Sequence, residues 1–208
     1  INEFSCIKIK VGALNRKDEV TFLQKLRSSH GFDFEIRLDA NEAFEPDEAL
    51  SFLKEIEPLN IHSIEQPIKR NRWLEMSQLV RSSPIKIALD EELIGVVNND
   101  RREQLLKAIQ PDYVILKPSL IGGLKETEKW TNLCTKHHIH WWVTSALESN
   151  IGLNAIAQWT YKFADDRPQG LGTGKLFTNN IPSPLEIRHG KLYYNPSGEW
   201  NINRFLAP

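Results

Sequence analysis

Five charged residues follow one another at a nearly constant interval along the sequence. Lys10, Asp39, Glu65, Asp90 and Lys117 are separated by 29, 26, 25 and 27 residues. Each comes at the end of a short β-rich run, as in IKIALD and YVILK. Three carboxylates on neighbouring strands would repel one another unless a cation lay between them, and oxygen-only ligands favour Mg²⁺, Mn²⁺ or Ca²⁺ over zinc. The pattern therefore predicts a divalent-cation site between two lysines.

A further lysine, Lys8, stands two residues before Lys10 and so points to the same face of its strand. If that face is the interior of a β-barrel, crowding and burial lower the pKa of both ammonium groups. A lysine with a lowered pKa can act as a general base. Lys117 is expected across the site from them. A base, a metal and an opposing cation favour removal of a proton beside a carboxylate. The alternatives are an edge strand with exposed lysines, and acids that cap helices or pair with surface lysines.

The same rhythm continues at Ser145 and Gly172, which gives seven predicted strand ends. The β-rich runs are Phe4–Val11, Phe34–Asn41, Ile61–Pro67, Ile85–Glu91, Asp112–Ser119, Ile139–Ala146 and Pro168–Gly174. Helical patterns lie between them, and strand–helix–strand units at this spacing form a parallel sheet. A (β/α)₈ barrel needs eight strands and about 250 residues, so we expect one strand, and with it an N-terminal domain, before Ile1. An open doubly wound sheet is the alternative, but the sequence has neither a G-x-G-x-x-G nor a Walker motif.

Local signals place several element boundaries. Asn15 and Asn150 are expected to cap helices, and Pro46 is expected to be the first residue of another. The tail after Pro184 is predicted to form a hairpin that turns at His189–Gly190 and leaves the barrel.

Composition excludes several classes of protein. The 208 residues include 26 Lys and Arg and 27 Asp and Glu. The chain therefore lacks the surplus of positive charge that is typical of a nucleic-acid binder. No apolar run approaches the roughly 20 residues of a membrane helix. Cys6 and Cys134 make no disulfide framework, which favours a reducing, cytoplasmic compartment. The expected partner is a small molecule, and the sequence makes no prediction of oligomeric state.

The ordered motifs resemble those of the enolase superfamily, in its muconate-lactonising branch. The motifs are Lys8-Ile9-Lys10, Asp39-Ala40-Asn41, Glu65-Gln66-Pro67, Asp90-Glu91, Lys117-Pro118, Ser145-Ala146-Leu147-Glu148-Ser149 and Gly172-Thr173-Gly174. Within that branch the sequence is most similar to the o-succinylbenzoate synthase family. The resemblance implies a TIM-type (β/α)₇β barrel over residues 1–184, without its first strand and N-terminal capping domain. The tail, residues 185–208, would pack on that cap.

The resemblance also implies a role for each motif residue. Mg²⁺, or Mn²⁺ as a substitute, would be bound by three carboxylates, those of Asp39, Glu65 and Asp90. Lys10 would take the α-proton of a small carboxylate substrate and return it to the departing hydroxide, while Lys8 would support the carboxylate and tune Lys10. Lys117 would stabilise the anionic intermediate. Two further residues, Asn41 and Glu91, would support these groups from behind.

The reaction implied is that of a hydro-lyase of menaquinone biosynthesis. It is the syn dehydration of 2-succinyl-6-hydroxy-2,4-cyclohexadiene-1-carboxylate to 2-succinylbenzoate. Ser145 and the backbone near Gly172 and Thr173 would contact the succinyl tail. Formation of an aromatic ring makes this dehydration downhill, so the enzyme has chiefly to stabilise the enediolate.

Other functions remain open. An N-succinylamino acid racemase would use Lys10 and Lys117 on opposite faces of its substrate, and a muconate-type cycloisomerase is less favoured. A dipeptide epimerase is expected to carry Asp-x-Asp near the last strand, where this chain has Gly172-Thr173-Gly174. An inactive barrel that serves as a scaffold or binding protein would be expected to have lost a metal ligand or Lys10.

Several other features are interpreted as structural. Three histidines, His137, His138 and His140, fall between a helix and the next strand, at the end of the barrel opposite the site. Gly122–Gly123 is interpreted as a turn rather than an anion cradle, and Arg101–Arg102 as a solvated helix start.

Overall fold

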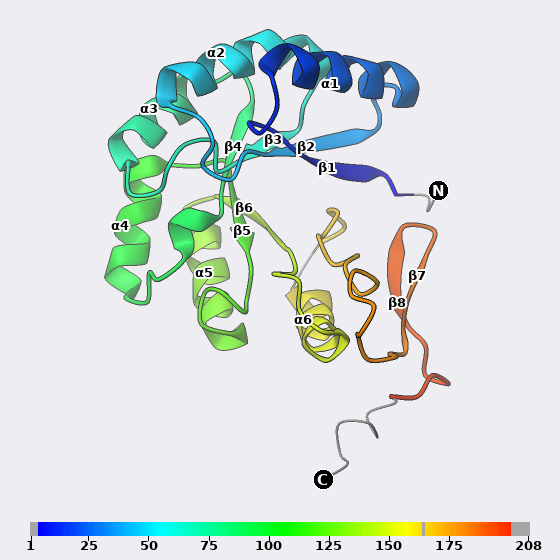
Figure 1. Cartoon of the computed structure of the whole chain (residues 1–208). Helices are drawn as coiled ribbons and strands as arrows, with labels where there is room; N and C mark the ends of the chain where they lie inside the picture. The colour runs from blue at the N-terminus through cyan, green and yellow to red at the C-terminus, as the bar shows by residue number, and fades with distance from the viewer. Residues whose placement is uncertain (1–3, 164, 201–208) are drawn as a thin grey trace.

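A single curled parallel sheet forms the centre of the protein, whose computed structural model describes residues 4–163 and 165–200. Its strand order follows the chain. The strands are β1 (Cys6–Lys10), β2 (Glu35–Asp39), β3 (Ser63–Glu65), β4 (Lys86–Leu89), β5 (Tyr113–Leu116) and β6 (His140–Val143). Figure 1 shows helices following the outside of this curve, so that the sheet is a half-barrel. The α/β class is confirmed, and the open doubly wound sheet is not what forms.

Helices lie between the strands, and three of them begin within one residue of the starts predicted from Asn15, Pro46 and Asn150. They are α1 (Arg16–His30), α2 (Pro46–Ile56), α3 (Trp73–Ser82), α4 (Asn99–Ile109), α5 (Leu124–Lys136) and α6 (Asn150–Phe163), with short 3₁₀ turns η1 (Glu57–Leu59) and η2 (Glu91–Leu93). Asn15 caps α1, since its side chain accepts from the N–H of Lys17 at 3.0 Å. Asn150 is not a cap. Its own N–H donates to the Asn180 side chain at 2.9 Å, so the loop supplies the acceptor that starts α6.

The strand register brings the predicted strand-end residues into line. Lys10 lies beside Asp39, and Asp39 lies beside Glu65, on three successive strands. Glu65 pairs with Ala88, so Asp90 comes two residues further along the chain, directly after β4. Because side chains alternate along a strand, all four side chains are directed to the concave side of the sheet at its carboxyl edge.

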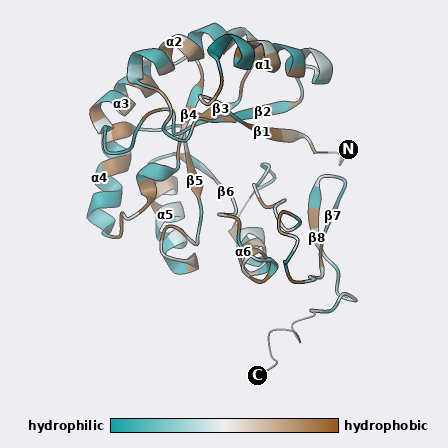
Figure 2. Ribbon diagram, viewed as in Figure 1, coloured by the Kyte–Doolittle hydropathy of each residue, from teal (hydrophilic) through white to brown (hydrophobic). Residues whose placement is uncertain are grey.

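The core lies between the sheet and the helices. Figure 2 shows apolar residues on the strands and on the sides of the helices that face them. In α2, Ala49, Phe52, Leu53 and Ile56 are all fully buried, and they repeat at the period of a helix with one apolar face. This layer holds the strands, and therefore the charged strand ends, in fixed positions.

One core substitution has a large expected effect on stability. Phe52 is fully buried and its ring stacks on Phe44 at 5.2 Å between centroids. Phe52→Ala is expected to lower the free energy of unfolding by about 3–5 kcal/mol, because it removes buried area and leaves a cavity. Urea unfolding followed by circular dichroism measures this change. The control is Phe22→Ala at a ring that is 51% exposed, and equal losses for both variants would contradict this core assignment.

The predicted seventh strand is reduced to one contact. Of Pro168–Gly174, only Gly170 forms a parallel bridge, to Thr144. The side chain of Gln169 takes the next position, because its Oε1 accepts from the N–H of Val143 at 2.7 Å. A side-chain amide thus stands where the strand backbone was expected. The prediction of seven strands is wrong for the described residues, in which six strands form the sheet.

The C-terminal hairpin forms as predicted. β7 (Leu185–Arg188) and β8 (Lys191–Tyr194) pair antiparallel, and both turn residues, His189 and Gly190, have positive φ. Figure 1 places this hairpin apart from the parallel sheet, near the N-terminal end of the chain. Leu185 and Leu192 pack partly against the main core. Across the described residues, we find no helix with the length and apolar content needed to cross a bilayer.

Candidate active site

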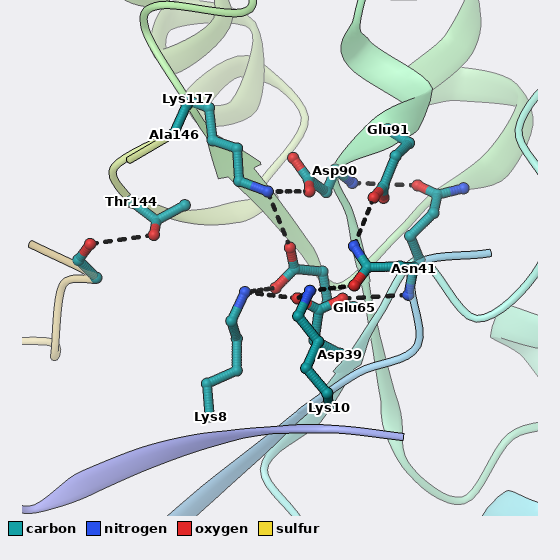
Figure 3. A network of polar contacts seen from close by, with 12 residues as sticks. Lys8, Lys10, Asp39, Asn41, Glu65, Asp90, Glu91, Lys117, Thr144 and Ala146 are labelled. Atoms are coloured by element: carbon teal, nitrogen blue, oxygen red, sulfur yellow. Dashed lines mark hydrogen bonds and ion pairs between the residues drawn. The ribbon is translucent and has the colours of Figure 1, made fainter. Parts of the chain in front are cut away.

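Charged side chains from five strand ends meet at the concave face of the half-barrel (Figure 3). The three carboxylates are almost inaccessible, with exposures of 0% for Asp39, 1% for Glu65 and 3% for Asp90. Lys10 and Lys117 reach this cluster from opposite ends of it, and the acids lie between them. The structure therefore brings together the five residues that the sequence spacing singled out.

Two lysines bridge the three carboxylates. Lys8 Nζ lies 2.7 Å from Asp39 Oδ2 and 2.8 Å from Glu65 Oε2. On the other side, Lys117 Nζ lies 3.3 Å from Glu65 Oε1 and also pairs with Asp90 Oδ2. The charges alternate along the row, which reduces the repulsion among the buried acids.

Lys10 differs from the other two lysines in its exposure. Its side chain is 63% exposed, against 35% for Lys8 and 15% for Lys117. Its ammonium group lies 2.8 Å from Asp39 Oδ2 and also donates to Asn41 Oδ1. Lys10 is therefore the ammonium group best placed to meet a substrate that enters from solvent.

The electrostatic balance of the cluster is incomplete at Asp90. Burial and the neighbouring Glu65 carboxylate raise the pKa of Asp90 to about 8, despite its contact with Lys117. Burial also acts to raise the pKa of Asp39, but Lys8 and Lys10 outweigh it and the pKa of Asp39 falls. The Asp90–Glu65 side of the cluster thus needs more positive charge than the lysines supply.

The prediction that Lys8 has a lowered pKa is wrong for this arrangement. Burial acts in that direction, but Glu65 and Asp39 outweigh it and raise the pKa of Lys8. The pKa of Lys117 is raised in the same way, because Glu65 and Asp90 outweigh its burial. The sequence showed the crowding of two lysines but not the carboxylates that surround them.

The donor set fits a divalent cation such as Mg²⁺. Within residues 4–163 and 165–200, no group of three His, Cys, Asp or Glu side chains is arranged so that it could hold a metal ion. Lys8 and Lys117 instead bridge the carboxylates. All the carboxylate donors are oxygens, which Mg²⁺ prefers. A divalent cation would offset the burial and the Glu65 repulsion that raise the pKa of Asp90.

Asn41 and Glu91 lie beside the cluster and hydrogen-bond to each other. Asn41 Nδ2 donates to Glu91 Oε1 at 2.8 Å, while the Asn41 N–H donates to Asp39 Oδ1 at 3.2 Å. Asn41 adopts a positive φ of 43°. This backbone conformation turns the chain directly after Asp39 and brings the amide back toward the carboxylate.

The three predicted substrate-binding residues lie apart from this network. Ser145 follows β6 and donates to Glu148, while the buried Thr173 Oγ1 has no hydrogen-bond partner within the described residues. Gly172 lines a pocket of about 550 Å³ that also reaches Lys8. In the part of the chain that the structure describes, no hydrogen bond connects Ser145, Gly172 or Thr173 to the lysines or carboxylates of the cluster.

The histidines and the glycine pair lie where a structural role was expected, but Arg102 does not. The three histidines line a pocket of about 410 Å³ together with Lys86 and Tyr113, which begin β4 and β5, so they lie at the opposite end of the strands. Gly123 forms a turn, since its N–H donates to the Pro118 carbonyl at 2.7 Å. The solvated interpretation is wrong for Arg102, which is fully buried and bonded to Glu126 at 2.7 Å.

Sequence reasoning missed two buried polar residues beside the carboxylates. Gln66 is 0% exposed and Glu92 is 3% exposed. The Gln66 side chain accepts from the N–H groups of Asp90 and Glu92, and its Nε2 donates to the Glu92 carboxylate. The signal was present. A glutamine within SIEQP and a second acid after Asp90 are polar residues in runs that are otherwise buried.

Comparisons with known proteins agree with this geometry. The family described as Enolase C-terminal domain-like matches residues 1–197. The chain is 48% identical over 190 residues to an o-succinylbenzoate synthase of Desulfotalea psychrophila, covering 91% of this chain and 51% of that protein. It is 30% identical over 156 residues to a D-Ala-D/L-Ala epimerase of Cytophaga hutchinsonii, covering 75% of this chain and 41% of the epimerase. The chain thus spans about half the length of these curated relatives.

Solved structures give the same result. The crystal structure of MenC from Desulfotalea psychrophila superposes with a TM-score of 0.87 at 47% identity, covering 92% of this chain and 53% of that one. A muconate cycloisomerase from Pseudomonas fluorescens also gives a TM-score of 0.87, but at 22% identity, with 99% of this chain and 58% of that one covered. The second likeness shows the fold alone. By sequence and by structure, the chain belongs to the Enolase C-terminal domain-like family.

Proposed function

We propose that this chain is the barrel portion of an o-succinylbenzoate synthase, which dehydrates 2-succinyl-6-hydroxy-2,4-cyclohexadiene-1-carboxylate. The observation that carries the proposal is the placement of Lys10 and Lys117 on opposite sides of three buried carboxylates. The 48% identity to the synthase of Desulfotalea psychrophila supports this substrate over others of the superfamily.

The lysines account for the chemistry of this dehydration. The Lys10 amine would take the proton from the carbon beside the substrate carboxylate, and the ammonium group so formed would then protonate the departing hydroxyl, which leaves as water. Lys8 would hold the substrate carboxylate, and Lys117 would stabilise the negative charge of the enediolate from the opposite side. Mg²⁺, or Mn²⁺ in its place, bound by Asp39, Glu65 and Asp90, would supply positive charge to the substrate carboxylate.

The rest of the enzyme would complete the barrel and close its mouth. We propose that the sheet gains a first strand beside β1 and that a capping domain covers the cluster, with residues 185–208 packing on the cap and residues 1–184 forming the barrel. Ser145, Gly172 and Thr173 would then contact the succinyl tail. A cytoplasmic location suits the two cysteines, which are free thiols.

An N-succinylamino acid racemase is the second candidate. The same two lysines could remove and deliver a proton on opposite faces of an α-carbon, so the geometry of the cluster allows it. Lys10 and Lys117, which both candidates would use, are present. An inactive scaffold is disfavoured, because Lys10, Lys117 and the three carboxylates are all retained.

A comparison of substrates tests the proposal. We expect the complete polypeptide to show a higher kcat/KM for loss of the cyclohexadiene absorbance than for racemisation of N-succinylamino acids followed by polarimetry. Both assays are run with the same enzyme and Mg²⁺ concentrations. A higher kcat/KM for racemisation would replace the synthase by the racemase.

A further inference from the structure

Gln66 joins the loops that follow the three carboxylate-bearing strands. It comes directly after Glu65 and is fully buried. Its carbonyl accepts from the N–H of Glu42 at 2.8 Å, in the loop after Asp39, and its own N–H donates to Ala88 of β4 at 2.9 Å. The main chain of this one residue therefore connects the ends of β2, β3 and β4.

The side chain of Gln66 holds the backbone at Asp90. Its Oε1 accepts from the N–H groups of Asp90 at 3.1 Å and Glu92 at 3.2 Å. Its Nε2 donates to the carbonyl of Ile68 at 3.1 Å and to Glu92 Oε2 at 3.4 Å. The amide thus uses both its acceptor and its donor, and it fixes the point from which the Asp90 side chain extends.

The backbone of Gln66 is strained. Its φ is +38°, in the left-handed region that side-chain-bearing residues rarely adopt. Such strain persists only where surrounding contacts determine the conformation, and it concentrates at functional sites. Here the conformation turns the Gln66 side chain toward the Asp90 segment while Glu65 keeps its place in the sheet.

Glu92 holds the amide of Gln66 in one orientation. Its carboxylate is 3% exposed and accepts from Trp73 Nε1 at 2.6 Å and from the N–H of Asn71 at 2.8 Å, in addition to Gln66. No Lys or Arg of the described residues forms an ion pair with it. Because a carboxylate only accepts, it requires the Nε2 side of the Gln66 amide to face it, which leaves Oε1 for Asp90.

We propose that Gln66 is the positioning residue that sets the relative places of Asp39, Glu65 and Asp90 for a divalent cation, and that Glu92 fixes its amide. The inference rests on the proposed function of the cluster, to which it adds a pair of residues. Outer partners of metal ligands affect metal affinity by orienting the ligands, without contacting the metal or the substrate.

The test is a titration of the complete polypeptide with Mn²⁺, in which electron paramagnetic resonance counts the free ion. Gln66→Glu is expected to weaken Mn²⁺ binding by about 10–100-fold, since it sets a second carboxylate against Glu92 and removes both Nε2 hydrogen bonds. The double exchange Gln66→Glu with Glu92→Gln keeps the acceptor toward Asp90 and restores a donor–acceptor pair between the two side chains. We expect it to recover most of the lost affinity. Gln24→Glu, at an exposed position of α1, is the charge control.

The outcomes separate this inference from a general loss of structure and from the proposed function. Wild-type affinity in Gln66→Glu, or a double exchange that binds no better than Gln66→Glu, overturns the inference. If Gln66→Glu does not fold, the double exchange decides alone, and a loss in it as large as the expected 10–100-fold contradicts the inference. Mn²⁺ binding needs no turnover, so a wild-type protein that binds Mn²⁺ without dehydrating the substrate contradicts only the proposed function.

Discussion

Lys10→Ala is expected to lower kcat for dehydration by about 10²–10⁴-fold, the usual contribution of a general base. The reason is that Lys10 is the most exposed ammonium group of the cluster and the one that would take the α-proton. The loss is measured as the rate at which the cyclohexadiene absorbance falls under saturating substrate. Lys25→Ala, at an exposed position of α1, provides the matched control.

A second readout shows whether the Lys10 effect is chemical. Lys10 carries no metal-binding role, so the Lys10→Ala protein is expected to bind Mn²⁺ and to unfold at the wild-type temperature within a few degrees. Turnover that stays unchanged in Lys10→Ala would remove this residue from the proton transfer.

Asp90→Asn is expected to weaken Mg²⁺ binding by more than about 10²-fold, because loss of a direct ligand exceeds the effect of an outer partner. Activity at fixed Mg²⁺ should fall with it. The metal-free protein should behave differently. Burial and Glu65 raise the pKa of Asp90 to about 8, so the charged form is disfavoured in the fold and a neutral amide should not lower the melting temperature.

Calorimetric titration with Mg²⁺ and thermal unfolding in EDTA measure these two effects of Asp90→Asn. Asp47→Asn, at an exposed position in the first turn of α2, is the control for both. Wild-type affinity for Mg²⁺ in Asp90→Asn would remove this residue from the ligand set. A much lower melting temperature in EDTA would show that its charge stabilises the fold instead.

The repeating distance between strand ends is what made the site predictable. In a parallel sheet each strand–helix unit returns the chain to the same edge, so residues about 27 apart in sequence, such as Asp39 and Glu65, become neighbours. The interval and the residue types together therefore predicted five members of the cluster. The start of helix α2 was equally clear, because Pro46 is its first residue, as predicted.

The predictions of a seventh strand, of a solvated Arg102 and of a lowered pKa for Lys8 were wrong. In the first a side chain takes the place of a backbone group, and in the other two the partner comes from a distant part of the sequence. The Gln169 side chain accepts the hydrogen bond that the backbone of a seventh strand was expected to accept. No periodic pattern in the sequence predicts that a side chain will replace the backbone in this way. Arg102 is buried because Glu126, on the next helix, pairs with it. The pKa of Lys8 depends on carboxylates from two other strands, and only their distances show which effect prevails.

A single assay with the complete polypeptide tests the proposed metal-dependent dehydration most directly. The cyclohexadiene absorbance is followed first with Mg²⁺, then after removal of the metal with EDTA, and again after Mg²⁺ is restored. We expect rapid dehydration that stops with EDTA and returns with Mg²⁺, because the buried carboxylates would serve the reaction only through a bound cation. Dehydration that continues at the same rate in EDTA would contradict the metal site, and no dehydration under any condition would contradict the synthase.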